Sequence, residues 1–293
     1  MPVFEVYIPA RDQSGRNVTL TVEAANWLGA LQTGLLNSGE DARSVGNVLC
    51  DLQSDGSIHV TDASNGRVFR LRHLEATSSQ TGTEPSMPAV NQDAPRFKTA
   101  PRPMSRSESA PQSTDPAIGR SFEKVDVEEV IADIFERTMD LYTDRLNPDK
   151  IVNDLLDLAM EKVPSDAGTF YVADISSLDL QFAAVRGPKA KEVLASGIRV
   201  PMGQGIAGVC ALESISVAIS DAQRDPRFSR EISEKIGYEA HSMVCVPLDK
   251  DGRCYGAIQL INRQGRTTYT PSDMAILTAV GQQAVELLSK VQT

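Results

Sequence analysis

The residues best suited to chemistry in this sequence are its cysteines and histidines. The four cysteines are Cys50, Cys210, Cys245 and Cys254, and no two of them form a C-x-x-C pair. Structural zinc sites and disulfide frameworks need close and regular spacing of such residues. We therefore expect reduced thiols, no metal site and no cofactor.

The composition also excludes several classes of function. The formal net charge is −10, which argues against nucleic acid as a partner because phosphate binding needs a concentrated basic surface. No apolar run approaches the ~20 residues of a membrane span, and the N-terminus lacks a secretory signal. No Ser-His-Asp, paired-carboxylate or phosphate-loop signature is present. We therefore expect a cytoplasmic protein that is not an enzyme.

A glycine-rich loop is the most specific local feature. It reads Gly203-Gln204-Gly205-Ile206-Ala207-Gly208 and precedes a short segment expected to be helical. Glycine lets the backbone approach a ligand closely at a helix N-terminus, where free N–H groups favour an anionic or carbonyl group. The same residues also suit a tight structural turn, and the sequence leaves both interpretations open.

The elements around this loop indicate an α+β fold. Asn147 and Pro148 are typical of a helix N-cap and first turn, and a helix is expected to run from there to about residue 162. Strand and helix patterns then alternate. Strands are expected at 168–175, 180–185, 198–200, 215–219, 243–248 and 254–261, and helices near 189–195, at 209–212, before 237 and at 271–291.

Composition divides the chain into four parts. Residues 1–76 predict a small α+β domain of order ββαβββ, with no catalytic pattern. We expect this domain to dock a protein partner, which the sequence does not identify. Residues 77–119 are rich in Pro, Ser and Thr, which predicts a disordered linker. Residues 120–146 predict a connecting helix, and residues 147–293 a second domain.

The connecting helix, expected over 122–144, carries an apolar seam. Its residues recur at spacings typical of an a/d pattern, which pairs helices in coiled coils and bundles. They are Val127, Ile131, Ile134, Thr138 and Leu141. The alternative is a helix packed on its own domain. We favour a homodimer formed through helices 122–144 and 271–291.

Five short motifs, taken in order, make residues 147–291 resemble the GAF domain, as found in cyclic-nucleotide phosphodiesterases and bacterial signalling proteins. They are Gly203-x-Gly205-Ile206-Ala207-Gly208, Asp221-Ala222 with Asp225-Pro226-Arg227-Phe228, Gly237-Tyr238, Cys245-Val246-Pro247-Leu248 and Gly256-x-Ile258-x-Leu260-x-Asn262. The resemblance implies an antiparallel sheet of about six strands, with helices on one side and a ligand pocket under loops on the other. It also implies small-molecule sensing and dimerisation.

The resemblance extends to a structural brace. Asn262, Arg263, Tyr269 and Asp273 stand at the spacing of the family's Asn-Lys…Phe…Asp signature. In that signature, Lys and Asp form an ion pair that joins the last strand to the last helix. Arginine can replace lysine because its guanidinium binds a carboxylate with two hydrogen bonds. We expect an exposed pair, which contributes only ~0–1 kcal/mol to stability.

The resemblance also implies ten ligand-binding positions. These are Thr169, Val185, Arg186, Ile206, Ala207, Phe228, Ser229, Ile236, Ala240 and Gln259. Cyclic-nucleotide binders have Phe-Asp at Val185 and Arg186, two threonines at Ile236 and Ala240, and an acid at Gln259. A purine would lose roughly 1–3 kcal/mol for each unmade polar contact, so cyclic GMP and cyclic AMP are disfavoured. An apolar molecule, another signal or no ligand at all remain open.

The sequence therefore predicts a non-enzymatic signalling protein with a sensory and dimerising GAF domain. One alternative is a pure protein–protein scaffold, and another is a cyclic-nucleotide-binding regulator. A third is a GAF-type free methionine sulfoxide reductase, because Gly208-Val209-Cys210 matches part of that pattern. Cys245, however, lies in an apolar strand, where a thiol keeps a raised pKa and is inert. Bilin attachment is rejected because His241 is not preceded by a cysteine.

Overall fold

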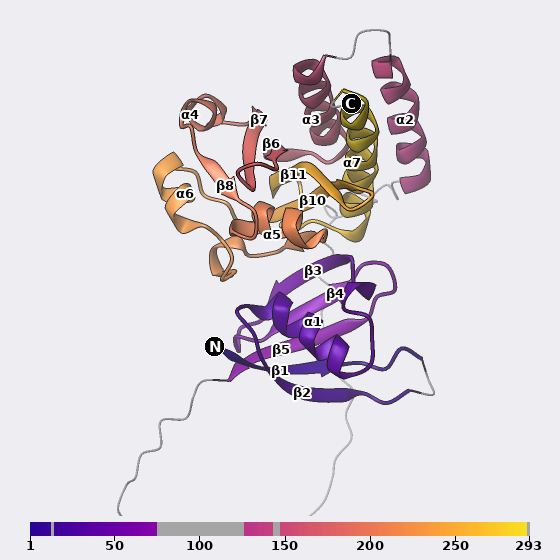
Figure 1. Ribbon diagram of the computed structural model, residues 1–293, viewed down its shortest axis with the longest axis vertical. Coiled ribbons are helices and arrows are strands. Elements are labelled where there is room, and N and C mark those ends of the chain that lie inside the picture. The colour runs from indigo at the N-terminus through magenta and orange to yellow at the C-terminus, as the bar shows by residue number, and fades with distance from the viewer. Residues whose placement is uncertain (13–14, 75–125, 143–146, 292–293) are drawn as a thin grey trace, which may run out of the picture. The chain divides into compact units, whose positions relative to one another are not determined.

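The computed structural model describes residues 1–12, 15–74, 126–142 and 147–291. The predicted linker at 77–119, and residues 122–125 and 143–144 of the predicted connecting helix, lie outside the described residues. The described residues form an α+β fold around one eleven-stranded sheet of order β2-β1-β5-β4-β3-β9-β10-β11-β6-β7-β8 (Figure 1). The class agrees with the prediction, and the sheet contains more strands than expected because two sets of strands join.

The N-terminal strands follow the predicted order ββαβββ. The elements are β1 (Val3–Ile8), β2 (Val18–Glu23), α1 (Trp27–Asn37), the short 3₁₀ turn Ala42–Ser44, β3 (Asn47–Leu52), β4 (Ile58–Asp62) and β5 (Val68–Leu74). Alternate residues of β1 are buried, and the buried face of α1 packs in the same apolar cluster. The Asn26 side chain caps α1 by accepting a hydrogen bond from the Gly29 N–H at 2.9 Å.

Two helices open the C-terminal part of the chain. They are α2 (Val127–Met139), followed by the 3₁₀ turn Asp140–Tyr142, and α3 (Pro148–Lys162). The predicted cap of α3 is confirmed, because Asn147 Oδ1 accepts from the N–H groups of Asp149 and Lys150 at 3.0 and 3.2 Å.

Six strands and four further helices complete the C-terminal part. They are β6 (Ser165–Asp174), β7 (Asp179–Arg186), α4 (Ala190–Ala195), β8 (Arg199–Pro201), α5 (Gly205–Glu213), β9 (Ser216–Ile219), the 3₁₀ turn Ala222–Arg224, α6 (Arg230–Ile236), β10 (Met243–Lys250), β11 (Arg253–Arg263) and α7 (Pro271–Val291). The strands pair antiparallel in the order β9-β10-β11-β6-β7-β8. The predicted order of strands and helices is therefore confirmed.

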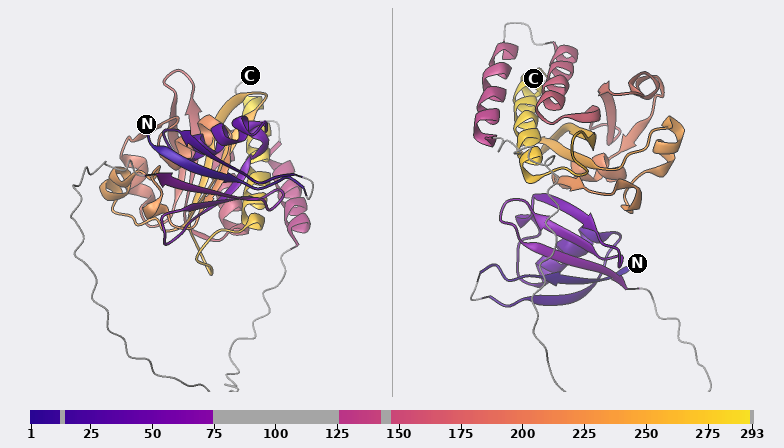
Figure 2. Two further views of the ribbon diagram at one scale, coloured as in Figure 1. Left: turned by 90° about the horizontal axis from the view of Figure 1, so that it is seen from below. Right: turned by 180° about the vertical axis from the view of Figure 1, so that it is seen from behind.

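The two faces of these six strands are covered differently. Because side chains alternate along a strand, Ile258 and Leu260 of β11 join the apolar cluster under α2, α3 and α7, while Ala257 joins the opposite cluster. Figures 1 and 2 show α2, α3 and α7 beside one another on one side of these strands. The shorter helices α4, α5 and α6 lie on the other side. We refer to the two sides as the helix face and the cavity face.

Glycines allow the strands and the helices α3 and α7 to approach one another closely on the helix face. A Cβ atom placed on Gly168 of β6 would lie 2.7 Å from Met160 Sδ and 3.1 Å from Leu156 Cδ1 of α3. A Cβ on Gly281 of α7 would lie 3.3 Å from Leu248 Cδ2. The helix face is therefore filled by side chains at both contacts.

The predicted seam of α2 packs within its own chain. Ile134 and Thr138 are fully buried, and the Thr138 hydroxyl lies 3.1 Å from Gln283 Oε1 of α7. The other three seam residues, Val127, Ile131 and Leu141, pack partly buried against the same cluster. The structure thus shows the intrachain contact that the sequence left as an alternative. Pairing of two copies through α2 and α7 remains a prediction.

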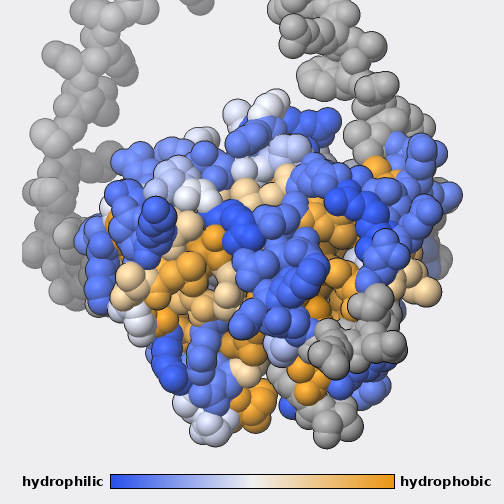
Figure 3. Space-filling model, turned by 90° about the horizontal axis from the view of Figure 1, so that it is seen from above, coloured by the Kyte–Doolittle hydropathy of each residue, from blue (hydrophilic) through white to orange (hydrophobic). Residues whose placement is uncertain are grey.

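The outer side of α2 exposes two large apolar side chains. Phe135 is 43% exposed and Met139 is 66% exposed. On the face drawn in Figure 3, hydrophobic residues are exposed in several patches separated by hydrophilic ones. Isolated exposed apolar residues are ordinary on protein surfaces, so these two residues do not by themselves define an interface.

The predicted brace forms, but it is buried rather than exposed. Arg263 Nε and Nη2 lie 3.1 and 3.0 Å from Asp273 Oδ1, and the two side chains are only 12% and 7% exposed. Asp273 Oδ2 accepts from the Thr270 N–H and hydroxyl, each at 2.9 Å. The Tyr269 and Ser165 hydroxyls lie 2.9 Å apart, and Asn262 accepts from the His241 N–H at 2.7 Å. The expectation of an exposed pair was wrong, because both side chains are largely buried. The small contribution expected for stability stays a prediction.

A parallel strand pair joins the N-terminal strands to the C-terminal ones. Residues Asn47–Cys50 of β3 stand opposite Ser216–Ile219 of β9. The Ser216 N–H donates to the Gly46 carbonyl at 2.9 Å, and the Ser220 N–H donates to the Cys50 carbonyl at 3.2 Å. The sequence analysis treated residues 1–76 as a separate domain and did not anticipate this pairing.

Candidate functional site

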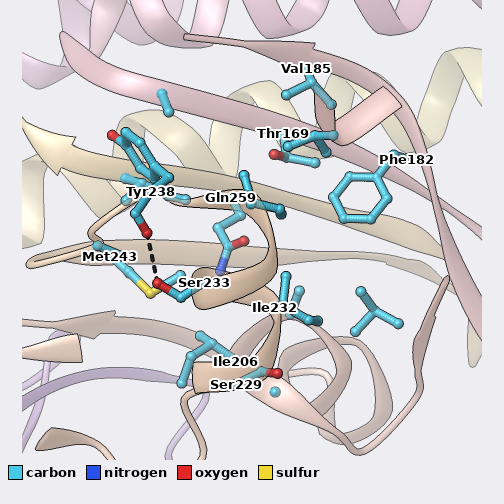
Figure 4. A pocket seen from close by; sticks show the side chains of 18 of the residues that line it. Thr169, Phe182, Val185, Ile206, Ser229, Ile232, Ser233, Tyr238, Met243 and Gln259 are labelled. Carbon is cyan, nitrogen blue, oxygen red and sulfur yellow. Dashed lines mark hydrogen bonds between the residues drawn. The ribbon is translucent and has the colours of Figure 1, made fainter. Parts of the chain in front are cut away.

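A cavity of about 120 Å³ lies on the cavity face, between the sheet and the helices α4, α5 and α6 (Figure 4). All ten residues predicted at ligand-binding positions line it. They are Thr169, Val185, Arg186, Ile206, Ala207, Phe228, Ser229, Ile236, Ala240 and Gln259. The structure therefore brings the predicted set together around one space. Ligand binding by these residues remains a prediction.

The sheet side of the cavity carries one buried amide among apolar groups. Gln259 of β11 is 4% exposed, and its Oε1 accepts from the Tyr171 hydroxyl at 3.1 Å. Burial raises the pKa of the Tyr171 phenol well above its usual range, so this group stays protonated and remains a donor. Gln259 Nε2 has no hydrogen-bond partner among the described residues, and Figure 4 shows the amide at the cavity.

The opposite side of the cavity is formed by α5, α6 and the residues just before α6. Ile206 of α5 and Ile232 of α6 contribute apolar side chains. The Ser233 hydroxyl donates to the Tyr238 carbonyl at 2.7 Å, which fixes the end of α6 (Figure 4). Ser229 is the N-cap residue of α6 but makes no side-chain capping bond, so its hydroxyl is available at the cavity.

The charged residues at the cavity are already paired. Among the described lining residues only Arg186 and Lys189 carry charge, and none is acidic. Arg186 Nε and Nη2 lie 2.7 and 2.9 Å from the two carboxylate oxygens of Asp157, and this contact raises the pKa of Arg186. Lys189 Nζ lies 3.6 Å from Glu192 Oε1. The interior of the cavity is therefore mainly apolar and uncharged.

Several further residues line the cavity at positions that simple periodicity indicates. Ala167 and Tyr171 lie two residues either side of Thr169 on β6, and Ile261 lies two residues after Gln259. Because side chains alternate along a strand, a named position predicts its i±2 neighbours on the same face. On α6, Ile232 and Ser233 follow Ser229 at helical spacing. Phe182 and Met243 also line the cavity, and no local pattern singled them out.

The glycine-rich loop forms a tight turn. The Gly203 N–H donates to the Gly208 carbonyl at 2.8 Å, and the Gln204 N–H donates to the Pro201 carbonyl at 3.0 Å. A Cβ atom on Gly208 would lie 2.3 Å from the Pro201 oxygen, so only glycine fits there. The loop positions Ile206 and Ala207 at the cavity, and its first two N–H groups are used internally.

Neither cysteine of the reductase hypothesis lines the cavity. Cys210 and Cys245 are both fully buried, and no cysteine is among the described residues that line the cavity. Burial raises the pKa of the Cys210 thiol well above its usual range, which keeps it uncharged. In the described parts of the chain, no cluster of three or more His, Cys, Asp or Glu residues could hold a metal ion. None of the described helices is both long and apolar enough to cross a membrane.

Curated relatives are phosphodiesterases that this chain matches over a short part of their length. A dual 3′,5′-cyclic-AMP and -GMP phosphodiesterase 11A of Takifugu rubripes is 38% identical over 82 residues, which are 27% of this chain and 9% of the relative. A cGMP-specific 3′,5′-cyclic phosphodiesterase of Drosophila pseudoobscura pseudoobscura is 26% identical over 191 residues, 60% of this chain and 16% of the relative. The matches thus cover less than a fifth of these relatives.

Two solved structures resemble the C-terminal part. The GAF domain of a phosphoenolpyruvate-protein phosphotransferase from Coxiella burnetii has 15% identity and a TM-score of 0.49, and the match covers 57% of this chain and 94% of that one. A free methionine-R-sulfoxide reductase from Neisseria meningitidis has 20% identity and a TM-score of 0.46, with 57% and 90% covered. The family model described as the GAF domain matches residues 147–288. Residues 147–288 of this chain are a GAF domain.

Proposed function

We propose that this GAF domain is a non-catalytic sensor of small, uncharged and mainly apolar molecules. One observation carries the proposal. The cavity is lined mainly by apolar side chains, its two described cations are paired with Asp157 and Glu192, and the Gln259 amide lies at the cavity with no hydrogen bond from Nε2 to a described residue. A ligand with an apolar body and a single hydrogen-bond acceptor matches this arrangement, because buried polar groups gain most when paired.

The volume of the cavity sets the size of the ligand. At about 120 Å³ it is close to an engineered apolar cavity of ~150 Å³ in another protein, which binds benzene. A single aromatic or aliphatic ring therefore fits without rearrangement. A larger molecule either extends out of the cavity or displaces one of the covering helices.

Cyclic nucleotides are the ligands that the names of the relatives suggest, and the cavity does not favour them. A phosphate needs an unpaired cation or free N–H groups. Arg186 is bound to Asp157 through two hydrogen bonds. In the glycine loop the N–H groups of Gly203 and Gln204 are used within the turn, which leaves only those of the first turn of α5 for an anion. No acidic residue among the described lining residues is available to read a guanine edge. Cyclic GMP therefore serves as the negative probe.

Titration of the full chain with benzene tests the proposal. We expect saturable heat of binding and a rise in melting temperature, because a ligand at 100 times its Kd stabilises the folded state by ~2.7 kcal/mol. Val185→Phe fills the cavity and is expected to abolish both signals while the chain stays folded. Binding of cyclic GMP instead of benzene would favour the regulator alternative, and absence of any uptake would favour the scaffold alternative.

The reductase alternative predicts turnover of free methionine sulfoxide that depends on Cys210 and Cys245. We expect no turnover, because both thiols are buried away from the cavity. Activity that disappears in Cys210→Ser or Cys245→Ser would contradict the proposal directly.

A further inference from the structure

The segment that leads into α6 contains a buried ion pair. Arg227 Nε and Nη2 lie 2.9 and 2.8 Å from the two carboxylate oxygens of Asp225, and the Arg227 N–H donates to Asp225 Oδ1 at 2.9 Å. The two side chains are 3% and 6% exposed. The next residue, Phe228, already lines the cavity. The ion pair therefore directly precedes, in the sequence, a residue of the cavity wall.

This ion pair is covered by the N-terminal strands and helix. The Arg227 guanidinium carbon lies 4.3 Å from the centroid of the Trp27 ring, and Trp27, the first residue of α1, is fully buried. A cation over an indole ring is a favourable contact that strengthens when water is excluded. The Trp27 ring of the N-terminal segment thus contacts Arg227, the residue just before Phe228 of the cavity wall.

The contact is incompletely satisfied. Arg227 Nη1 and Trp27 Nε1 are both buried, and neither has a hydrogen-bond partner among the described residues. Separation of Trp27 from Arg227 would let both donors bind water, which offsets part of the loss of the stacking contact. A ligand that binds better to the separated arrangement would therefore shift the contact toward it.

This contact adjoins the α6 side of the cavity rather than its sheet side. The sheet side is fixed by the backbone hydrogen bonds of β6, β7 and β11. The α6 side is one short helix, Arg230–Ile236, which begins three residues after Arg227. A ligand larger than the cavity will therefore displace α6 more readily than the sheet, and the displacement begins at Arg227.

We propose that residues 1–76 are the responding element of the cavity: a ligand that displaces α6 weakens the contact between Arg227 and Trp27 and loosens the pairing of β3 with β9. This inference rests on the proposed sensory function and adds the part of the chain that responds to ligand binding. It gives residues 1–76 a role within the chain, as a part whose docking is coupled to occupancy of the cavity. By linkage, variants that weaken the docking must also change ligand affinity.

The sole tryptophan of the chain reports on the contact. Two probes that differ in size are titrated into the full chain: benzene, which fits the cavity, and n-butylbenzene, which exceeds it. We expect n-butylbenzene to make Trp27 more accessible to acrylamide, saturating together with its heat of binding, and benzene to have a smaller effect. In Val185→Phe neither probe is expected to change the quenching. Binding of n-butylbenzene with unchanged quenching would overturn the inference and leave the sensor proposal intact, as would binding of benzene alone.

A second measurement needs no ligand and decides the matter if neither probe binds. Hydrogen–deuterium exchange is compared in Arg227→Met, in the doubly neutral Asp225→Asn/Arg227→Met, and in the control Arg224→Met, which changes an exposed arginine of the same segment. We expect faster exchange in β3, β9 and α6 in the first two variants, and no change in α4 or in the control. Faster exchange in β3 and β9 with unchanged α6 would contradict the coupling, as would equal acceleration of α4.

Discussion

Side chains alternate between the two faces of the six GAF strands, and the two faces are packed differently. On β11, Ile258 and Leu260 point to the helix face and are completely buried against α3 and α7. Gln259, between them, points to the cavity face. The helix face is closed by long helices whose approach is set by glycines. The cavity face is covered by short helices and keeps an empty volume of about 120 Å³.

This difference indicates where stability and function lie in the domain. Close packing makes each methylene on the helix face costly to remove. The cavity face already contains a void, so its residues give up less packing when they are shortened. We therefore expect sequence change to be better tolerated on the cavity face, where the lining can be altered without loss of the fold.

The largest expected effect comes from shortening an isoleucine on each face. Ile258→Ala should lower the free energy of unfolding by about 4 kcal/mol, within the usual range for buried isoleucine. Ile206→Ala, at the cavity, should cost only about 1–2 kcal/mol because one side of its side chain already faces empty space. Urea unfolding of both variants measures the difference, and equal losses would show that the two faces are packed alike.

The next effect tests the brace that joins β11 to α7 at the helix face. Arg263→Met leaves the Asp273 carboxylate buried without its cation, and we expect a loss of about 3 kcal/mol. The matched control is Arg199→Met, whose partner Asp174 lies 3.2 Å away and whose side chain is 50% exposed. Surface pairs contribute ~0–1 kcal/mol, so the control should change little. Similar losses of unfolding free energy in both variants would show that the brace contributes no more than a surface ion pair, as the sequence predicts.

A smaller effect concerns the Gln259 amide at the cavity. Phenol differs from benzene by a hydroxyl that can pair with Gln259 Nε2, so the wild-type chain should bind phenol about fivefold more tightly, which corresponds to ~1 kcal/mol for one hydrogen bond. Gln259→Leu should remove this preference and leave benzene affinity nearly unchanged. Calorimetric titration of both molecules measures the ratio. A preference that persists in Gln259→Leu would assign the hydrogen bond to another group, such as Ser229.

The smallest expected effect on stability concerns the outer layer of the helix face. Met139→Glu on α2 should change the unfolding free energy by less than about 0.5 kcal/mol because the side chain is 66% exposed. If two copies pair through α2 and α7, light scattering should give twice 31.7 kDa for the wild type and 31.7 kDa for the variant. Glu136→Gln, on the same helix, is the control. A monomeric mass for the wild type would contradict the predicted homodimer.

Local pattern was sufficient to predict most of the elements. The alternation along β11, the Asn147 cap and the turn dipeptides each depend on neighbours in the chain, so they can be read from a single sequence. The ten cavity residues came from aligned positions of the family motifs. Their i±2 partners, such as Tyr171, were available from the same alternation and were overlooked.

Contacts between distant segments could not be predicted in this way. The buried pair Asp225–Arg227 reads as an ordinary charged turn, and its burial depends on Trp27, two hundred residues earlier. Arg186 was named as a ligand contact, but its partner Asp157 lies on another element. The a/d seam of α2 fits a helix of the same chain as well as one from a second copy, because the pattern specifies an apolar neighbour without specifying its source.

The pairing of β3 with β9 also determines how this protein should be handled. All four residues of β9, Ser216–Ile219, are buried, and β3 occupies one side of that strand. A fragment that begins at residue 147 would present this strand as a bare, largely apolar edge, the kind of surface on which chains stack into aggregates. Truncation to the GAF domain alone should therefore fail first through insolubility, before its affinity for any ligand could be measured.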